Sequence, residues 1–291
     1  MISLSILPDG WVVNCDPSQV CESSPVPERL WDDGDSLSVS RIGPAIDDRY
    51  RVRLSDDSCF DIWWPEQVIV DRSLNPTDST TLDHFLADQI VPRLIAHGGT
   101  LVLHAGAVQA MGGCLLIVGQ SGRGKSTLSK SFDNAGCRLM GDDAMMVMPL
   151  GPSYGAEPVY PSLRLMEDSI RALFSEDVVT SDVGVDSPKQ RVDMVKQQID
   201  PPRPIAIRAA FVIAAPSENL KIAVRPLSIA GACMVFIENS FTLDPTDMRR
   251  TRGRLDAASA LARAVPTFEI AYPRDYARLA EVRGSMLDYI S

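Results

Sequence analysis

The chain has 291 residues, of which 45% are hydrophobic and 23% charged, and its formal net charge is −10. These proportions are typical of a globular protein with a sizeable core, and they exclude wholesale disorder. The acidic balance opposes binding to nucleic acid or to an anionic membrane, where clustered Lys and Arg supply the affinity. The six cysteines form no CxxC pair, and the N-terminus lacks the features of a secretion signal, so we expect a cytoplasmic protein with reduced thiols.

Residues 1–80 have the pattern of a small β-rich accessory domain. Short alternating or β-branched runs are separated there by clusters of Pro, Gly, Asp and Ser. The runs cover residues 4–7, 11–14, 37–42, 50–54, 60–64 and 67–70. The region either packs as a structural domain or recognises a protein or peptide partner. The first interpretation is favoured, because aromatic residues in short sheets usually build core.

Residues 81–291 alternate between helical and strand patterns, which is typical of an α/β domain. A polar turn at 75–81 marks the expected boundary, and Pro92 is expected to kink the helix that follows. The predicted elements are a helix over 82–95, strands over 100–109 and 114–118, a helix over 124–134, a strand over 138–148, strands over 160–165, 208–214 and 268–271, and helices over 229–239 and 255–264.

Residues 119–126 read Gly-Gln-Ser-Gly-Arg-Gly-Lys-Ser and match the phosphate-binding pattern GxxxxGK[ST]. The glycines allow backbone N–H groups to wrap a phosphate, and the following helix directs the positive end of its dipole at the same anion. Lys125 is expected to bridge the β- and γ-phosphates and Ser126 to bind Mg²⁺ with its hydroxyl. The predicted nucleotide-binding residues are Gly119, Gln120, Ser121, Gly122, Arg123, Gly124, Lys125, Ser126 and Thr127, and the predicted cofactors are ATP and Mg²⁺.

Two carboxylates, Asp142 and Asp143, follow in the next strand-like run. An apolar strand normally avoids carboxylates, which favours a function, although Asp-Asp is also common in turns. Because adjacent strand residues point to opposite faces, we predict two roles: one Asp holds Mg²⁺ and the other accepts a proton from an attacking hydroxyl. His104, inside the apolar run 101–108, is either a hydrogen-bonded core residue or a neighbour of the phosphates.

Three segments together resemble the HPr kinase/phosphorylase-like proteins, bacterial serine kinases whose fold resembles that of phosphoenolpyruvate carboxykinase. The segments are Leu-His-Ala-Gly-Ala-Val at 103–108, the loop at 119–128, and Gly-Cys-Arg-Leu-Met-Gly-Asp-Asp at 136–143. The Tyr-Pro-Arg-Asp-Tyr run at 272–276 is similar to a closing signature of an HPr-kinase-related branch. The resemblance implies an α/β fold, namely a P-loop kinase domain with a mixed sheet and flanking helices.

The resemblance also implies roles for individual residues. Asp142 would be the base that takes the proton from the acceptor serine, and Asp143 would lie near the metal together with Ser126. His104 would stand beside the active site. The implied activity is that of an ATP-dependent serine kinase acting on a peptide or protein.

Three features together resemble kinases that phosphorylate the terminal serine of a lasso-peptide precursor. They are the β-rich region 1–80, the Lys-Ser-Thr sequence at 125–127 and the Tyr-Pro-Arg-Asp sequence at 272–275. Three alternatives stay open: an HPr-type regulatory kinase, a small-molecule kinase, and a non-catalytic nucleotide-binding sensor. A homo-oligomer also stays open. A kinase acting on a chain terminus would need a carboxylate clamp, and the speculative candidates are Lys189, Arg191, Arg250 and Arg252. Charge runs usually lie on the solvated surface, which is the competing interpretation of these four residues.

Overall fold

The computed structural model describes residues 7–14, 27–32, 37–54, 58–73, 82–83, 85–160, 163–175, 178–182, 189–192, 204–215 and 221–290. Contacts divide the chain into two compact units. Unit 1 comprises residues 1–97, 184–186 and 242–251, and unit 2 comprises the remainder. None of the helices in the described ranges is long and apolar enough to cross a membrane.

Unit 1 is built on a six-stranded sheet in the order β1-β6-β5-β4-β3-β2. Its strands are β1 (Val12–Asn14), β2 (Glu28–Asp32), β3 (Leu37–Arg41), β4 (Arg49–Leu54), β5 (Cys59–Trp63) and β6 (Val68–Asp71), and a single 3-10 turn, η2 (Ala45–Asp47), joins β3 to β4. All neighbouring strands are antiparallel except β1 and β6, which run parallel. The side chains alternate as a half-buried strand requires, with Leu37 and Val39 buried and Ser38 and Ser40 less so.

One helix packs on this sheet. Its π-helical part, η3 (Leu86–Ile90), runs directly into α2 (Val91–His97). Pro92 was expected to kink the helix, and the widened turn lies immediately before it, where a proline lacks the N–H for a regular helical bond. Leu86, Ile90 and Leu94 are buried in one cluster with sheet residues. The contacts therefore divide the chain after His97 rather than after residue 80.

Unit 2 contains a mixed nine-stranded sheet with the path β10-β8-β9-β16-β12-β11-β7, and β18 pairs with both β16 and β17. Its strands are β7 (Leu101–Leu103), β8 (Ala105–Ala110), β9 (Gly113–Val118), β10 (Arg138–Gly141), β11 (Met145–Leu150), β12 (Ser153–Pro158), β16 (Ile205–Ile213), β17 (Ala223–Pro226) and β18 (Thr267–Ala271). The central strands β9, β16 and β18 are parallel to one another. The expected mixed α/β architecture with flanking helices is present.

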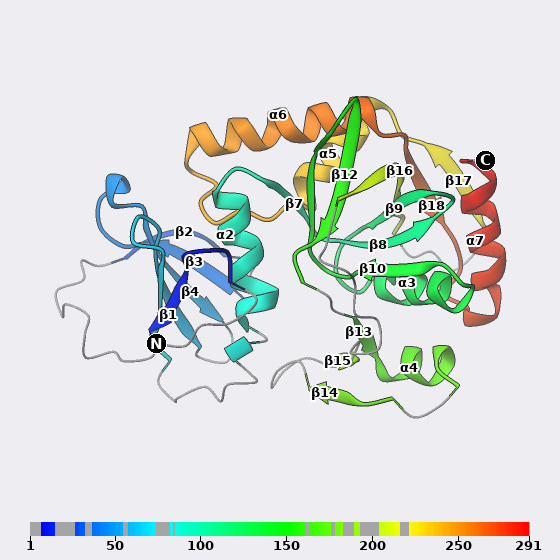
Figure 1. Cartoon of the computed structure of the whole chain (residues 1–291), viewed down its shortest axis with the longest axis horizontal. Helices are drawn as coiled ribbons and strands as arrows, with labels where there is room; N and C mark the ends of the chain where they lie inside the picture. The colour runs from blue at the N-terminus through cyan, green and yellow to red at the C-terminus, as the bar shows by residue number, and fades with distance from the viewer. Residues whose placement is uncertain are drawn as a thin grey trace. The chain divides into compact units, whose positions relative to one another are not determined.

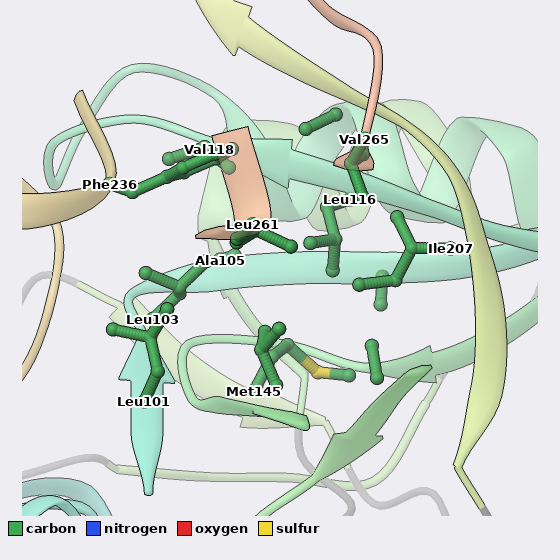
Figure 2. Close-up of a cluster of buried hydrophobic side chains, with 14 of the residues drawn as sticks. Leu101, Leu103, Ala105, Leu116, Val118, Met145, Ile207, Phe236, Leu261 and Val265 are labelled. Atoms are coloured by element: carbon green, nitrogen blue, oxygen red, sulfur yellow. The ribbon is translucent and has the colours of Figure 1, made fainter. Parts of the chain in front are cut away.

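Helices cover both faces of the nine-stranded sheet (Figure 1). They are α3 (Lys125–Asn134), α5 (Ile229–Glu238), α6 (Met248–Ala264) and α7 (Leu279–Asp288). Successive residues of β9 enter different cores, as the strand period requires. Leu116 and Val118 pack with Phe236 of α5 and Leu261 of α6, as Figure 2 shows. Leu115 and Ile117 belong to the other cluster, which contains residues of α3 and α7.

Two predicted strands are each divided in the structure. The run 100–109 breaks at His104 into β7 and β8, because β7 pairs with β11 whereas β8 pairs with β9 and β10. The run 138–148 breaks after Gly141 into β10 and β11. Asp142 and Asp143 therefore lie in irregular backbone, so the alternation of a regular strand does not apply to their side chains.

A small three-stranded sheet completes unit 2. It has the order β13-β15-β14, with β13 (Arg164–Met166), β15 (Lys189–Val192) and β14 (Thr180–Asp182). Helix α4 (Glu167–Leu173) follows β13 directly. Leu165 and Val192 of this sheet are buried in the same cluster as Leu128 of α3, which fixes the small sheet beside the phosphate-binding loop.

Candidate functional site

The candidate site lies where parallel strands of unit 2 end. Strand β9 ends at Val118 and leads into the loop 119–124, and β18 ends at Ala271 and leads into the segment 272–276. Because β9, β16 and β18 are parallel, their carboxyl ends meet at one edge of the sheet. This edge is where open α/β sheets usually bind their ligands.

The loop has the backbone that a phosphate cradle requires. Gly122 and Gly124 have φ angles of 75° and 96°, which side chains with a Cβ rarely adopt. Helix α3 begins immediately afterwards at Lys125, so its first N–H groups face the loop. The Lys125 ammonium donates a 3.2 Å hydrogen bond to the carbonyl of Gln120, which folds its side chain back over the loop.

Lys125 is almost removed from solvent, with 4% of its surface exposed. Burial lowers its pKa, and the nearby carboxylates Asp143 and Asp142 act in the opposite direction. A buried ammonium with negative charge close by is suited to hold an anion whose own charge compensates it. The negative charges of a bound triphosphate would compensate the buried charge of the Lys125 ammonium.

Asp142 is fully buried beside the start of α3. Burial and the adjacent charge of Asp143 raise its pKa to about 6, against the lowering effect of a hydrogen bond with Ser126 and of the charges of Lys125 and Arg164. The Ser126 hydroxyl and the Asp142 carboxylate are thus direct neighbours. A carboxyl group with a pKa close to neutrality is suited to exchange a proton.

Asp143 is held from two sides. The Nε atom of Arg164 donates to Oδ2 at 2.6 Å, and Nε2 of His104 lies 3.1 Å from Oδ1. Burial by itself would raise the pKa of Asp143, but Arg164 and His104 hold it well below its ordinary value. The residue has a φ angle of 69°, an uncommon conformation outside glycine. Asp143 therefore remains ionised at neutral pH.

His104 sits at the break between β7 and β8. Its backbone N–H donates a 2.6 Å bond to the carbonyl of Asn239, and its ring is 28% exposed. Surrounding protein atoms lower the pKa of the imidazole, while the hydrogen bond with Asp143 raises it. A neutral ring in this place donates through Nε2 to the ionised carboxylate. His104 therefore positions Asp143.

Gly106 of β8 leaves room for this arrangement. A Cβ atom at this position would lie 2.5 Å from the Ser129 hydroxyl of α3 and 3.3 Å from Oδ1 of Asp142. Both Asp142 and Ser129 are completely buried. The absence of a side chain at residue 106 is therefore a steric condition for the position of the carboxylate.

A cavity of about 390 Å³ opens beside the loop. Its lining includes residues 122–127 of the loop and α3 together with Arg164 and Lys189. It also includes larger apolar and aromatic residues, namely Leu165, Met166, Tyr272, Tyr276 and Leu279. The remaining lining residues are Asp168, Ser169, Arg274 and Asp275. A volume of this size is within the range of small-molecule sites.

The structure brings together most of the residues that the sequence selected. Lys125, Ser126, Asp142, Asp143 and His104 form one interacting group. Gly119, Gln120, Ser121, Gly122, Arg123 and Gly124 form the loop, and Thr127 lines the cavity. Lys189 also lines the cavity, although it comes from a different sheet.

The other proposed clamp residues are placed elsewhere. The guanidinium of Arg191 lies 5.9 Å from the centre of the Tyr160 ring, and Arg191 is not among the described residues that line the cavity. Arg250 belongs to unit 1, where it donates to Asp48 at 2.6 Å and to the carbonyl of His97 at 2.6 Å. Arg252 is exposed on α6. For Arg250 the structure assigns an ion-paired structural position instead of a free anion-binding one.

Sequence reasoning missed Arg164, Gly106 and the hydroxyls of Ser169 and Tyr276. Arg164 had one signal, since it is the one charged residue within the predicted strand 160–165. Gly106 had none, because its importance depends on what α3 places opposite it. The 272–276 run was noticed as a motif, but nothing in its composition indicated that it would contact the loop.

The residues present fit a magnesium nucleotide. Mg²⁺ is usually held by one or two carboxylates, water and phosphate oxygens rather than by an all-protein cage. The Ser126 hydroxyl and the buried Asp143 carboxylate would supply oxygens of this kind. A phosphate group in the loop would complete the set.

Comparisons with known proteins add one structural likeness. No protein-family model matches the chain, and no curated protein matches it. Among solved structures, the HPr(Ser) kinase/phosphatase from Coxiella burnetii is similar, with 14% sequence identity over 65% of this chain and 99% of that chain and a TM-score of 0.32. A likeness of this degree carries no argument about function, so the proposal below rests on the geometry of the site.

Proposed function

We propose that this chain is an ATP-dependent kinase that transfers the γ-phosphate to a serine hydroxyl of a peptide or protein. One observation carries the proposal: a phosphate-binding loop with a buried lysine lies directly beside two buried carboxylates with opposite pKa shifts. A protein that only binds a nucleotide needs one carboxylate for the metal. Pairs of titratable groups whose pKa values are driven apart are typical of acid–base chemistry.

In the proposed reaction, Lys125 and the loop amides hold the β- and γ-phosphates, and Arg164 adds positive charge in the same cavity. Asp142 accepts the proton of the acceptor serine hydroxyl while the oxygen of that hydroxyl forms a bond to the γ-phosphorus. The bond from that phosphorus to the β–γ bridging oxygen breaks, which leaves ADP and a phosphoserine. When bound near Ser126 and Asp143, Mg²⁺ would neutralise charge on the phosphate oxygens.

His104 and Arg164 keep Asp143 ionised and fixed, so that a second negative charge stays beside Ser126. This arrangement supports the division of labour that the resemblance implies, with Asp142 as the base and Asp143 near the metal. Both carboxylate oxygens of Asp143 already bond to Arg164 and His104, which favours Asp142 as the proton acceptor. Burial raises the pKa of Asp142, which is consistent with that role.

For the acceptor, we propose a peptide that ends in serine, such as the terminal serine of a ribosomally made lasso precursor. The resemblance to kinases of such precursors motivates this choice. Lys189 lines the same cavity as the loop, and its ammonium would pair with a terminal carboxylate. An HPr-type carrier protein and small hydroxyl metabolites are the alternative acceptors.

The experiment is a transfer assay with ATP labelled in the γ-phosphate and Mg²⁺. Four acceptors are compared: a peptide ending in serine with a free carboxylate, the same peptide as an amide, a peptide with an internal serine, and a set of small hydroxyl compounds. The proposal predicts label on serine, with the free carboxylate preferred over the amide. Lys189→Ala should reduce that preference.

Lys125→Ala tests the loop, and Lys130→Ala is its matched control. Lys130 lies on the same helix but is paired with Asp133 at 2.6 Å and does not line the cavity. Loss of transfer by about 100-fold or more is expected for the first variant only. ATP binding without transfer to any hydroxyl would contradict the kinase proposal and favour a nucleotide-binding sensor.

A further inference from the structure

The cavity beside the loop has lining residues that the phosphate chemistry does not use. Besides the charged groups of Lys125, Arg164 and Lys189, its lining includes the ring of Tyr276 and the side chain of Met166. These two residues are 39% and 41% exposed. Large apolar side chains left in contact with solvent inside a cavity mark a place that a ligand covers.

We infer that the segment 272–279 and the Thr127 side of α3 form the subsite for the nucleoside half of the nucleotide, with the base against the Tyr276 ring. The inference rests on the proposed function, since it concerns the other half of the same ligand. A nucleoside triphosphate has a charged tail and a flat apolar base. The cavity has the same two kinds of lining.

The segment is attached directly to the phosphate loop. Arg274 donates from Nη2 to the carbonyl of Gly122 at 2.8 Å. The Tyr272 hydroxyl would lie 3.3 Å from a Cβ atom at Gly124, so residue 124 and the segment are in close contact. The strand order explains this contact, because β18 and β9 are both parallel to β16 and end at the same edge.

The conformation around Tyr276 is preformed. The Asp275 carboxylate accepts a 2.9 Å bond from the Ala277 N–H, and the Asp275 carbonyl accepts one from the Arg278 N–H at 3.1 Å. These bonds fix the turn η5 (Tyr276–Arg278) just before α7. A ring on a fixed turn loses little freedom when a base stacks on it.

A chain of hydroxyl groups links this ring to the helix that would hold the phosphates. Thr127 Oγ1 lies 3.1 Å from Ser169 Oγ, which lies 2.9 Å from the Tyr276 hydroxyl. Ser126, one residue earlier, instead bonds Asp142. Successive residues of a helix point about 100° apart, so the metal side and the Tyr276 side of α3 are different directions. The nucleoside is therefore expected to leave the phosphates on the Thr127 side.

The test separates the two halves of the ligand. Binding of ATP and of inorganic tripolyphosphate, each with Mg²⁺, is measured by calorimetry for the full chain. Tyr276→Ala should weaken the binding of ATP by about tenfold, which corresponds to the loss of one base stacking on an aromatic ring. The same variant should bind tripolyphosphate as the unmodified protein does.

Tyr276→Phe is the conservative variant, and it should retain most of the ATP affinity because the ring remains. Met166→Ala is a second, exposed position in the lining of the same cavity, and it should also weaken the binding of ATP alone. Lys125→Ala should weaken both ligands, which shows that the assay reports the phosphate half.

Two results would overturn the inference: Tyr276→Ala binds ATP normally, or it loses ATP and tripolyphosphate to the same extent. An unmodified protein that binds tripolyphosphate as tightly as ATP would also overturn it while leaving the phosphate loop intact. If the unmodified protein binds neither ligand, the proposed function itself fails, which is a distinguishable outcome.

Discussion

Arg164 donates a 2.6 Å hydrogen bond from Nε to Oδ2 of Asp143, and the two side chains are only 13% and 4% exposed. An ion pair so far from water needs both partners, because each charge compensates the burial of the other. Together with His104, Arg164 keeps Asp143 ionised. Burial first, and the charge of Asp143 second, raise the pKa of the neighbouring Asp142. The division of acid–base roles in this site therefore depends on a residue from the small sheet.

The first prediction concerns pH. Asp142 must be ionised to accept a proton, and its pKa is raised to about 6. The value of kcat/KM, which reports groups of the free enzyme, should therefore be constant above this pKa and fall about tenfold per pH unit below it. Asp142→Asn should abolish transfer while ATP binding largely survives. A profile that stays flat well below this pKa would show that Asp142 is not the base.

The second prediction concerns the Arg164–Asp143 pair. Arg164→Ala leaves a buried carboxylate without its main cation, which costs about 3–5 kcal/mol of stability at neutral pH. The pKa of Asp143 is depressed in the folded protein, so the stability that this group contributes is present above its unfolded pKa of about 4 and is lost as pH falls. The melting-temperature difference between the two proteins should accordingly shrink in acid.

Arg171→Ala is the control for that measurement. Arg171 pairs with Glu167 on α4, but these side chains are 74% and 65% exposed. An exposed pair contributes about 0–1 kcal/mol, so this variant should melt almost like the unmodified protein. Equal effects of the two substitutions would refute the importance of the buried pair.

The third prediction concerns Gly106. Gly106→Ala introduces a Cβ atom 2.5 Å from the Ser129 hydroxyl and 3.3 Å from Asp142, so α3 or the carboxylate must move. The expected cost is about 1–3 kcal/mol, accompanied by a fall in kcat. Adding Ser129→Ala removes the closest atom and should restore part of both quantities. Gly284→Ala on α7 has open space around it and should be neutral or stabilising, since alanine is the better helix former.

The fourth prediction concerns Arg250, which the sequence selected as a clamp for the acceptor. In unit 1 its guanidinium donates to Asp48, whose other oxygen accepts from Tyr50 at 2.7 Å. Arg250→Ala should lower the melting temperature and leave the KM for the acceptor peptide unchanged, because the half-buried Asp48 carboxylate and the His97 carbonyl lose a donor. Arg249→Ala, at the exposed neighbouring position, should change neither quantity. A rise in that KM without any loss of stability would instead support a role of Arg250 in binding the acceptor carboxylate.

Much of unit 2 was predictable from local patterns. The helix expected at 124–134 and the strand at 114–118 agree closely with α3 and β9, because hydrophobic period and helix-start signals are properties of neighbouring residues. The breaks at His104 and after Gly141 were not predictable. They arise where the chain changes its pairing partner, and the partner is set by strand order rather than by composition.

The phosphate loop could be predicted from the amino-acid sequence because its functional residues are close together: three glycines, a lysine and a serine lie within residues 119–126, after a strand and at the start of a helix. The selection of Asp142, Asp143 and His104 depended on their unusual places in apolar runs. Their mutual arrangement, the ion pair with Arg164 and the contact between Arg274 and Gly122 arise only on folding, when separate strands align their ends at one edge. A hydrogen bond between residues 152 positions apart depends on that alignment, and no local pattern of side chains specifies it.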